Sequence, residues 1–417
     1  MSAAFAFFLS KVVQFGDLEV ATSDGVVRRY GDGSGPSIAI RIADRAAEWR
    51  LLADPALALG ELYMDGRLEL VRGDLYDFLE LGERNVSAGH APRWVALLDK
   101  LRIWIRAYYQ RNDRKRARKN IASHYDLDHR LYDLFLDADR QYSCAYFEHP
   151  DQSLEEAQLA KKRHIAAKLL IDDKMSALDI GCGFGGLGLY LAQNTSARVT
   201  GVTLSQEQQA IAGQRAREAG LSDRADFRLQ DYRDVEGQFD RLVSVGMFEH
   251  VGAARFDEYF WHVRRLLKGD GVMVLHAIGR NDPPGATNAW IEKYIFPGGY
   301  IPATSEVLAA IERQRLFVTD IEILRLHYAD TLRQWRARFL AHREQAKAMY
   351  DERFCRMWEF YLAGSETAFR VDGHMVFQIQ IAKSQDVVPR TRNYIAEREA
   401  LLRRREGPAA IPFRQAG

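Results

Sequence analysis

Closely spaced glycines in the stretch ALDIGCGFGGLGLYLA follow an apolar run, as in loops that hold a nucleotide cofactor. Gly181, Gly183 and Gly186 satisfy the pattern G-x-G-x-x-G, which also occurs in dinucleotide-binding domains. A dinucleotide site requires an acidic residue about 20 residues further on to hold the ribose hydroxyls. Thr203 and Ser205 stand there instead, so the sequence argues against a dinucleotide.

A carboxylate precedes these glycines. Asp179 lies two residues before Gly181, where it can face an ammonium group. This arrangement suits the amino acid end of S-adenosylmethionine and has no use beside a pyrophosphate. We therefore predict a methyl-donor site formed by Asp179, Gly181, Gly183 and Gly185. The alternative is that the glycines only allow a tight turn and that Asp179 binds backbone amides.

Polar side chains also follow the next two apolar runs. Ser205 and Gln208 form a capping-box pattern at the start of a helix, and the alternative is that Thr203 and Gln208 bind the ribose of the donor. The spacing alone favours neither role. In LQDYRD, Asp231 and Tyr232 end the third run, where they would contact the adenine through a hydrogen bond and a ring face. The alternative for Asp231 is a turn-forming role.

Titratable residues end the fourth and fifth apolar runs. Glu249 and His250 follow SVGMF, and His276 and Ile278 end GVMVLHAIG. A buried carboxylate is costly unless it is paired, so Glu249 near the donor's sulfonium suggests a function. The alternative is a surface pair that begins a loop. A single histidine such as His276 is more often a satisfied core residue.

Alternating strand-like and helical segments must position these residues. The strand-like runs are ALDIG, RVTGVTL, ADFRLQ, DRLVSVGMF, GVMVLHAIG, LFVTDIEIL and MVFQIQIAK. Helical patterns separate most of them, which predicts a doubly wound parallel sheet with ligands at the carboxyl ends of the strands. We predict an α/β protein with a Rossmann-like fold of the class I S-adenosylmethionine-dependent methyltransferases and a smaller N-terminal α+β domain.

The N-terminal part of the chain has a different character. Short strand-like runs such as SIAIRIA alternate with turn signals such as GDGSG, and an apolar helical pattern then precedes a basic stretch, RNDRKRARKN. The apolar positions are Trp94, Leu98, Leu101, Ile105 and Tyr108. We predict a lipid- or membrane-associated domain over residues 1–120 and a catalytic domain over residues 121–417. The alternative is that this helix packs on the catalytic domain and that its charges are merely solvated.

The composition limits the classes of partner. The 417 residues include 58 Lys and Arg against 57 Asp and Glu, so no overall field favours nucleic acid. The three cysteines have neither metal-ligand spacing nor a disulfide pattern, which indicates a reduced, cytoplasmic protein without a metal. The N-terminal apolar run is too short to cross a bilayer and lacks signal-peptide features. We expect any lipid to be reached from the membrane surface.

Eight segments together resemble the cyclopropane-fatty-acyl-phospholipid synthases and the related mycolic acid cyclopropane synthases. They are SHYDLDHRLYDLFLD, YSCAYFEHP, LDIGCGFGG, GVTLSQEQ, DYRD, SVGMFEHVG, FPGGYIP and HYADTLRQW, in the order of the family. The resemblance covers residues 121 to about 385 and is weaker over residues 1–120. It implies that S-adenosylmethionine methylates the cis double bond of an acyl chain and that a cyclopropane ring closes with bicarbonate held in the site.

The resemblance also implies roles for individual residues. It assigns the bicarbonate to five residues, here termed the cage: Cys144, Glu249, His276, Ile278 and Tyr328. Around the donor it places Tyr142, Ser143, Gly181, Thr203 and Gln208. It further implies a homodimer that binds unsaturated phospholipid and lies peripherally at the inner face of the membrane. The alternatives are a lipid methyltransferase that yields a methyl or methylene branch, a small-molecule methyltransferase, and a non-catalytic lipid-binding protein.

Overall fold

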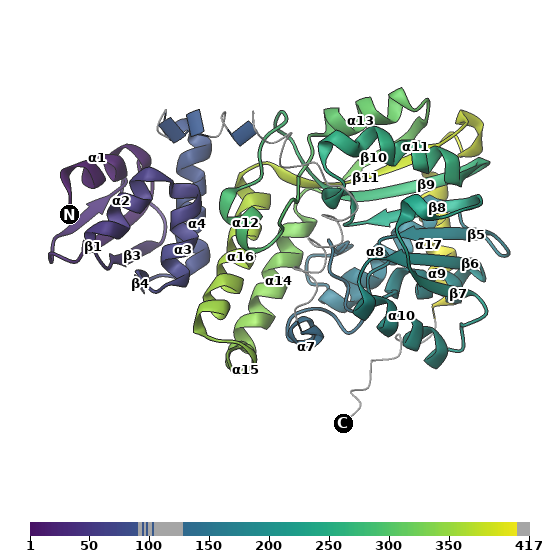
Figure 1. Ribbon diagram of the computed structural model, residues 1–417, viewed down its shortest axis with the longest axis horizontal. Coiled ribbons are helices and arrows are strands. Elements are labelled where there is room, and N and C mark those ends of the chain that lie inside the picture. Colours follow the sequence, from purple (N-terminus) through teal and green to yellow (C-terminus); the bar gives the residue numbers. More distant parts are fainter. Residues whose placement is uncertain (91–93, 96, 99–101, 104–127, 407–417) are drawn as a thin grey trace. The chain divides into compact units, whose positions relative to one another are not determined.

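The chain forms two compact units. The computed structural model describes residues 1–90, 94–95, 97–98, 102–103 and 128–406 (Figure 1). Unit 1 comprises residues 1–109, 285–297 and 332–374, and unit 2 comprises residues 110–284, 298–331 and 375–417. The predicted boundary at residue 120 lies outside the described residues. Unit 1 also takes in two later segments that the prediction placed in the catalytic domain.

Unit 1 contains a four-stranded sheet of order β2-β1-β3-β4 with helices. Its elements are α1 (Ala3–Val12), β1 (Asp17–Thr22), β2 (Val27–Tyr30), β3 (Ser37–Ile42), α2 (Arg45–Ala53), α3 (Pro55–Met64), β4 (Leu68–Arg72), α4 (Leu75–Asn85), α12 (Ala289–Tyr294), α15 (Arg343–Met349) and α16 (Glu352–Val371). The carboxylates of Asp44, Asp54 and Asp74 accept backbone hydrogen bonds and thereby begin α2, α3 and α4. These caps fix where the helices of the small domain start.

The later segment that carries α12 belongs to unit 1 because its side chains complement α3. Trp290 Nε1 donates to Met64 Sδ at 3.2 Å, and Glu61 accepts from Lys293 at 2.6 Å and from Tyr294 at 2.8 Å. Gly60 makes room for the indole, since a Cβ there would lie 2.4 Å from Trp290 Nε1. The contact between α12 and α3 was not predicted because more than 220 residues separate the two helices in the sequence; it depends on the fit of Trp290 beside Gly60 and on the hydrogen bonds to Glu61.

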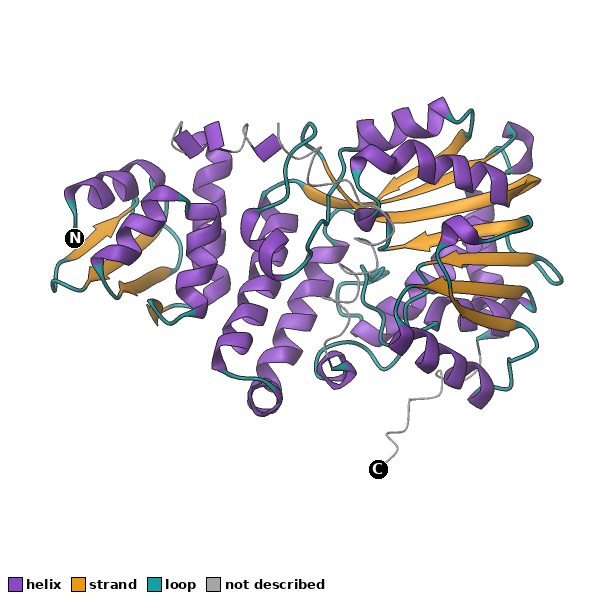
Figure 2. Cartoon of the chain, in the orientation of Figure 1, coloured by secondary structure: helices purple, strands orange, loops and turns teal. Residues whose placement is uncertain are grey.

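Unit 2 contains a seven-stranded sheet of order β10-β11-β9-β8-β5-β6-β7 (Figure 2). Its elements are α7 (His129–Asp133), α8 (Leu154–Leu169), β5 (Ser176–Ile180), α9 (Gly186–Thr195), β6 (Arg198–Thr203), α10 (Gln206–Glu218), β7 (Ala225–Leu229), β8 (Phe239–Val245), α11 (Phe256–Leu266), β9 (Leu267–Arg280), α13 (Thr304–Arg313), β10 (Phe317–Ile323), β11 (His374–Ala382) and α17 (Asn393–Arg405). All seven predicted strand runs form strands of this sheet.

The strands from β5 to β9 pair in parallel, as predicted, whereas β10 and β11 pair antiparallel. The prediction of a wholly parallel sheet was therefore wrong at this pair. The connection between the two strands runs through α14 (His327–Ala341), α15 and α16. Most of it belongs to unit 1, so it is not the crossover helix that joins parallel neighbours.

Helices cover both faces of this sheet, which confirms the doubly wound arrangement. Alternate strand residues face opposite sides. Ala177 packs in a core with α8, α9, α10 and α17, while its neighbour Leu178 packs in another core with α11 and α13. Figure 1 shows α11 and α13 on one side of the sheet and α8, α9 and α17 on the other. Both faces of the sheet are therefore buried in apolar cores, which leaves the strand ends as the place for a polar site.

The predicted amphipathic helix is only partly described. Trp94 and Leu98 belong to helical turns, and Trp94 lies 6.2 Å from Phe8 between ring centroids. Leu101, Ile105, Tyr108 and the basic stretch lie outside the described residues. Among the described helices, none is long and apolar enough to cross a membrane.

Candidate active site

A cavity lies at the carboxyl ends of β5, β6, β7 and β8 in unit 2. Its volume is about 1300 Å³ when its open mouth is included. Most of the predicted donor residues line it: Tyr142, Ser143, Asp179, Gly181, Gly183, Thr203, Gln208, Asp231 and Tyr232. These residues come from the ends of β5, β6 and β7, from the first turn of α10 and from the segment before α8. The sheet therefore brings together side chains that are up to 90 residues apart in the chain.

The glycines of the loop after β5 have two different functions. Gly181 and Gly183 have positive φ angles of 84° and 52°, and a Cβ on Gly181 would lie 2.7 Å from Met247. Both line the cavity, so their backbone forms its floor. Gly185 is outside the lining. It caps α9 at φ 81°, and a Cβ there would lie 2.8 Å from Ala212. We predicted Gly185 as a cofactor-binding residue, but it lies outside the cavity lining and instead lets the start of α9 pack closely against Ala212.

Asp179 is buried with its carboxylate at the cavity wall. Burial raises the pKa of Asp179 to about 7, and the charge of Lys161 acts in the opposite direction. Within the described part of the chain, no backbone amide donates to this carboxylate, so the alternative role that we considered for Asp179 has no contact to support it. A cation in the cavity would stabilise the ionised form.

Thr203 and Gln208 meet at the wall of the cavity. Thr203 Oγ1 donates to Gln208 Oε1 at 2.8 Å. The backbone nitrogen of Gln208 donates to Ser205 Oγ at 3.3 Å, which is the N-cap contact of α10. The capping role and the cavity-lining role therefore coexist in Gln208, because one uses the backbone and the other the side chain.

Asp231 and Tyr232 form the part of the wall that follows β7. Asp231 accepts from the backbone nitrogen of Arg233 at 3.0 Å and from its guanidinium at 2.6 Å. The turn-forming role that we considered for Asp231 is thus present, although its carboxylate still lines the cavity. The Tyr232 ring packs edge-on against Tyr259, with centroids 5.5 Å apart.

Lys161 also lines the cavity, and the sequence analysis missed it. Its side chain is fully buried on α8, and Nζ donates to Gln141 Oε1 and to Ser143 Oγ, both at 2.8 Å. The run KKR at residues 161–163 is typical of solvated charge. The available signal was helical spacing, since Lys161 follows Leu154 by seven residues and lies on the same helix face.

Two members of the cage are in direct contact. Glu249 lies in a short turn after β8, and its Oε1 accepts from the Ile278 backbone nitrogen at 2.6 Å. Burial raises the pKa of Glu249 to about 7. Its other oxygen, Oε2, is buried and has no hydrogen-bond partner among the described residues. Met247 and His250, on either side of Glu249, line the donor cavity. A buried, protonatable carboxyl group therefore borders the cavity.

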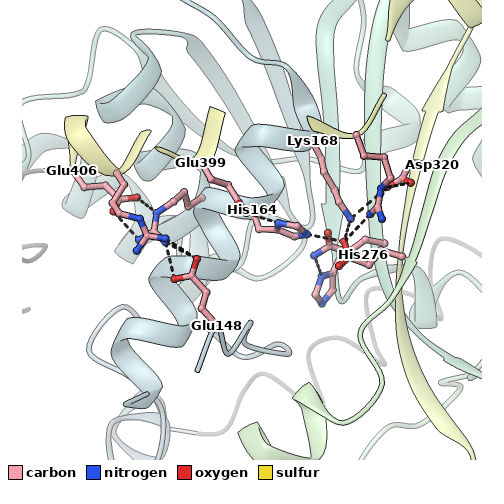
Figure 3. Close-up of polar contacts among 12 residues, drawn as sticks. Glu148, His164, Lys168, His276, Asp320, Glu399 and Glu406 are labelled. Atoms are coloured by element: carbon pink, nitrogen blue, oxygen red, sulfur yellow. Dashed lines mark hydrogen bonds and ion pairs between the residues drawn. The ribbon is translucent and has the colours of Figure 1, made fainter. Parts of the chain in front are cut away.

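His276 is buried on β9 and lies beside the central strand β8. Its backbone oxygen accepts from Gly246 at 2.9 Å, and its Nδ1 contacts Gln378 Nε2 at 3.1 Å (Figure 3). With Gln378 Nε2 as donor, Nδ1 is the acceptor and Nε2 carries the ring proton. Burial holds the pKa of His276 well below its ordinary value, so the ring is neutral.

Cys144 and Tyr328 lie on two segments that are bonded together. The Ala145 nitrogen donates to Thr331 Oγ1 and the Phe147 nitrogen donates to His327 Nδ1, both at 3.0 Å. These bonds hold the segment after Cys144 against the first turn of α14, which carries Tyr328. Both side chains are buried, and burial raises the pKa of the Cys144 thiol. A neutral thiol of this kind is a poor nucleophile.

The sheet order, the glycine loop after β5 and the cavity over the strand ends define a class I S-adenosylmethionine-dependent methyltransferase. Solved structures agree. The cyclopropane synthase MmaA2 from Mycobacterium tuberculosis has a TM-score of 0.61 and 32% identity, covering 64% of this chain and 98% of that chain. The mycolic acid cyclopropane synthase CmaA1 complexed with SAH and CTAB has a TM-score of 0.60 and 34% identity, covering 63% and 97%.

Sequence relatives specify the family. The family described as Mycolic acid cyclopropane synthetase matches residues 112–379, and a domain of unknown function, DUF7884, matches residues 7–88. The chain belongs to the mycolic acid cyclopropane synthetase family. The Escherichia coli (strain K12) cyclopropane-fatty-acyl-phospholipid synthase is 39% identical over 84% of this chain and 89% of its own length. Tuberculostearic acid methyltransferase UfaA1 from M. tuberculosis is 37% identical over 85% and 84%. The predicted family, fold and enzyme class are confirmed.

Proposed function

We propose that the protein is a cyclopropane-fatty-acyl-phospholipid synthase that transfers a methylene group from S-adenosylmethionine to the cis double bond of an unsaturated phospholipid acyl chain. Bound bicarbonate is the proposed base for ring closure. Glu249 carries the proposal: it is a buried carboxyl group with an unpartnered oxygen beside the donor cavity of a chain in this family.

The cavity residues fit the methyl donor. Bound S-adenosylmethionine supplies an electrophilic methyl group on a positively charged sulfur. In this proposal Asp179 holds the ammonium group of the donor, and Thr203 and Gln208 hold its ribose, since all three residues line the cavity. Asp231 and Tyr232 would contact the adenine, with Arg233 keeping the Asp231 carboxylate oriented. An alkene is a weak nucleophile, so this fixed orientation and the exclusion of water are the main contributions of the protein to methyl transfer.

The cage residues fit a small oxyanion that carries a proton. Methylation leaves a positive charge on the acyl chain, and the ring closes when the new methyl group loses a proton. Bound bicarbonate supplies the base for that loss. The unpartnered Oε2 of Glu249 would accept from the hydroxyl of the bound anion, and Nε2–H of neutral His276 would donate to it. The Ile278 amide already donates to Glu249, so it would have to be shared with the anion.

Ring formation is tested with purified protein and vesicles of a cis-unsaturated phospholipid. Donor is added with and without bicarbonate after degassing, and the acyl chains are examined by gas chromatography and mass spectrometry. We expect a ring product whose rate rises with bicarbonate. A methylene branch adds the same mass but fragments differently, and 37% identity to a tuberculostearic acid methyltransferase makes a branched product the second candidate. Untouched phospholipid in the presence of both compounds would reject the proposal.

Peripheral association with the inner face of the membrane is also part of the proposal. On unit 1, Phe7 of α1 and Trp49 of α2 are 64% and 58% exposed, as expected for residues that insert into a lipid surface. Phe7→Ser and Trp49→Ser variants should sediment less with anionic vesicles. Trp261→Ser is the matched control, since Trp261 is 51% exposed on unit 2. Equal sedimentation of all three variants would contradict the assignment of lipid binding to unit 1.

A homodimer is the last part of the proposal and rests on the family resemblance. Analytical ultracentrifugation of the full chain at several concentrations tests it. We expect a mass of twice 47.6 kDa. A monomer mass that persists at all concentrations would remove the dimer from the proposal without affecting the chemistry.

A further inference from the structure

Lys161 is a buried cation without a carboxylate partner. α8 carries three buried lysines, and two of them are paired: Lys162 Nζ lies 2.6 Å from Asp139, and Lys168 contacts Glu322 (Figure 3). Among the described residues, no carboxylate oxygen lies within ion-pair distance of Lys161. Fully buried lysines are rare unless they are paired. The exception on this helix is the lysine that lines the donor cavity.

The neighbouring carboxylates act on Lys161 from a distance but do not form an ion pair with it. Asp139 is bound by Lys162 and by Arg215. Burial raises the pKa of Asp179 to about 7, so this carboxyl group is only partly ionised near neutral pH. Asp137 accepts hydrogen bonds from the backbone nitrogens of Asp139 and Gln141 and forms no ion pair with Lys161. Burial lowers the pKa of Lys161 to about 8, against the opposing charges of Asp137 and Asp139, so the amine remains a cation at pH 7.

The hydrogen bonds of Lys161 hold its ammonium group beside the segment that contains Tyr142, Ser143 and Cys144. Its two hydrogen bonds go to Gln141 and Ser143, the residues just before Cys144. One turn earlier on α8, Gln158 Nε2 donates to the Ser143 backbone oxygen at 2.9 Å. The Lys161 charge also acts on Cys144 and His276, which the family resemblance places around the anion. An ammonium group has three hydrogens, and these two bonds use only two of them.

We propose that Lys161 is the counter-ion of a carboxylate-class anion bound at this wall of the cavity. Two ligands share this chemistry: the carboxylate of the methyl donor's amino acid end and bicarbonate. In the first case Asp179 binds the ammonium group and Lys161 binds the carboxylate of the donor's amino acid end. In the second case Lys161 balances an anion placed beside Glu249. The inference rests on the proposed function only for the bicarbonate case.

Calorimetry with the full-length protein tests this inference. S-adenosylhomocysteine is the probe for the amino acid end, methylthioadenosine is the probe that lacks it, and sodium bicarbonate is the third ligand. We expect Lys161→Met to weaken either S-adenosylhomocysteine or bicarbonate at least tenfold, because truncation of one partner of a buried charge pair is costly. Methylthioadenosine binding should change less than threefold, which also shows that the cavity is folded. Lys161→Arg, which keeps the positive charge, should bind the same ligand more tightly than Lys161→Met does.

Lys162→Met is the matched control, as a buried lysine on the same helix that pairs with Asp139 outside the cavity lining. It should leave all three affinities within threefold. If Lys161→Met and, as a second neutral variant, Lys161→Gln bind S-adenosylhomocysteine and bicarbonate like the wild type, the inference is wrong. Equal losses for methylthioadenosine would also overturn it, since the role would then be structural. Normal donor binding by a wild-type protein that forms no ring would reject the proposed function alone.

Discussion

The donor cavity and the cage are built in different ways. Backbone and partnered side chains form the cavity: Gly181 and Gly183 supply its floor, and Thr203 and Gln208 bond to each other at its wall. Three residues of the proposed cage, Cys144, Glu249 and His276, are buried groups whose pKa values are shifted by burial, and Glu249 also has a carboxylate oxygen without a hydrogen-bond partner among the described residues. We therefore expect the cavity to position the donor through its shape and the charges of Asp179 and Lys161, and the proposed cage to hold groups whose protonation states matter to the chemistry.

This difference predicts different kinetic consequences. A change in the cavity removes binding that the ground state and the transition state share, so it should mainly raise the KM for the donor. A change in the cage removes an interaction that matters only after methyl transfer has begun, so it should mainly lower kcat. The variants below test this contrast.

Glu249→Gln should have the largest effect. The amide keeps the size of the side chain but cannot carry charge, and it places a donor where the anion needs an acceptor. We expect kcat to fall at least 100-fold, within the range for loss of an acid-base or electrostatic group, with S-adenosylhomocysteine affinity within threefold. Steady-state kinetics and calorimetry measure both quantities.

The control for this variant is Glu236→Gln, which changes an exposed glutamate of the same unit and should alter kcat less than twofold. A Glu249→Gln enzyme that forms ring product at the wild-type rate would remove Glu249 from the cage. If Glu249→Gln instead weakened donor binding strongly and left kcat unchanged, the predicted difference between the cavity and the cage would be wrong.

Asp179→Asn should stabilise the protein while weakening donor binding. Burial raises the folded-state pKa of Asp179 from 3.8 to about 7, so the folded state binds this proton more tightly than the unfolded state. The wild type therefore loses stability as pH rises from about 4 to about 7, by up to about 4 kcal/mol. The asparagine variant escapes this loss.

Thermal unfolding at pH 5 and pH 8 measures the effect. We expect the Tm of Asp179→Asn to exceed that of the wild type by more at pH 8 than at pH 5. The same variant should bind S-adenosylhomocysteine at least tenfold more weakly, because the ammonium group loses its counter-charge. A Tm difference that is independent of pH would show that Asp179 is not a buried acid in the apo protein.

The sequence allowed prediction of the elements whose signals are local. All seven strands of the unit 2 sheet were marked by apolar runs, and the cavity residues follow from the rule that ligands bind at the carboxyl ends of parallel strands. The antiparallel pairing of β10 and β11 was missed because it depends on a connection that runs through unit 1. Lys161 was missed because it stands in the charged run KKR, although its spacing from Leu154 places it on the buried face of α8, and its contacts with Gln141 and Ser143 cannot be read from that spacing. Glu249, His276 and Ile278 were singled out at strand ends, whereas Cys144, Tyr328 and the grouping of all five residues as a cage came from the family resemblance, because four separate segments must meet to form it.

Gly185→Ala should separate packing from donor binding within one loop. Gly185 has φ 81°, and a Cβ would lie 2.8 Å from Ala212 and 2.9 Å from Phe227. The backbone strain and the overlap together should cost about 2–3 kcal/mol of unfolding free energy. Chemical denaturation measures the loss. The remaining folded protein should bind S-adenosylhomocysteine within threefold of the wild type, whereas a tenfold weaker affinity would restore Gly185 to the donor site.

Gln208→Ala should have the smallest effect, since it removes one wall contact and keeps the N-cap of α10. The capping bond uses the Gln208 backbone nitrogen and Ser205 Oγ, so the helix should still begin at the same residue. Loss of the side chain leaves Thr203 Oγ1 without its acceptor, and we expect the donor KM to rise about three- to tenfold with kcat nearly unchanged.

Gln209→Ala is the matched control for Gln208→Ala. Gln209 is the next residue of α10, and its Nε2 donates to the Phe227 backbone oxygen at 3.0 Å outside the cavity lining. Its KM should stay within twofold. If both variants raised KM equally, the effect would come from α10 as a whole and not from the Thr203–Gln208 contact. If Gln208→Ala lowered kcat as strongly as Glu249→Gln, the cavity and the cage would have to be treated as one coupled site.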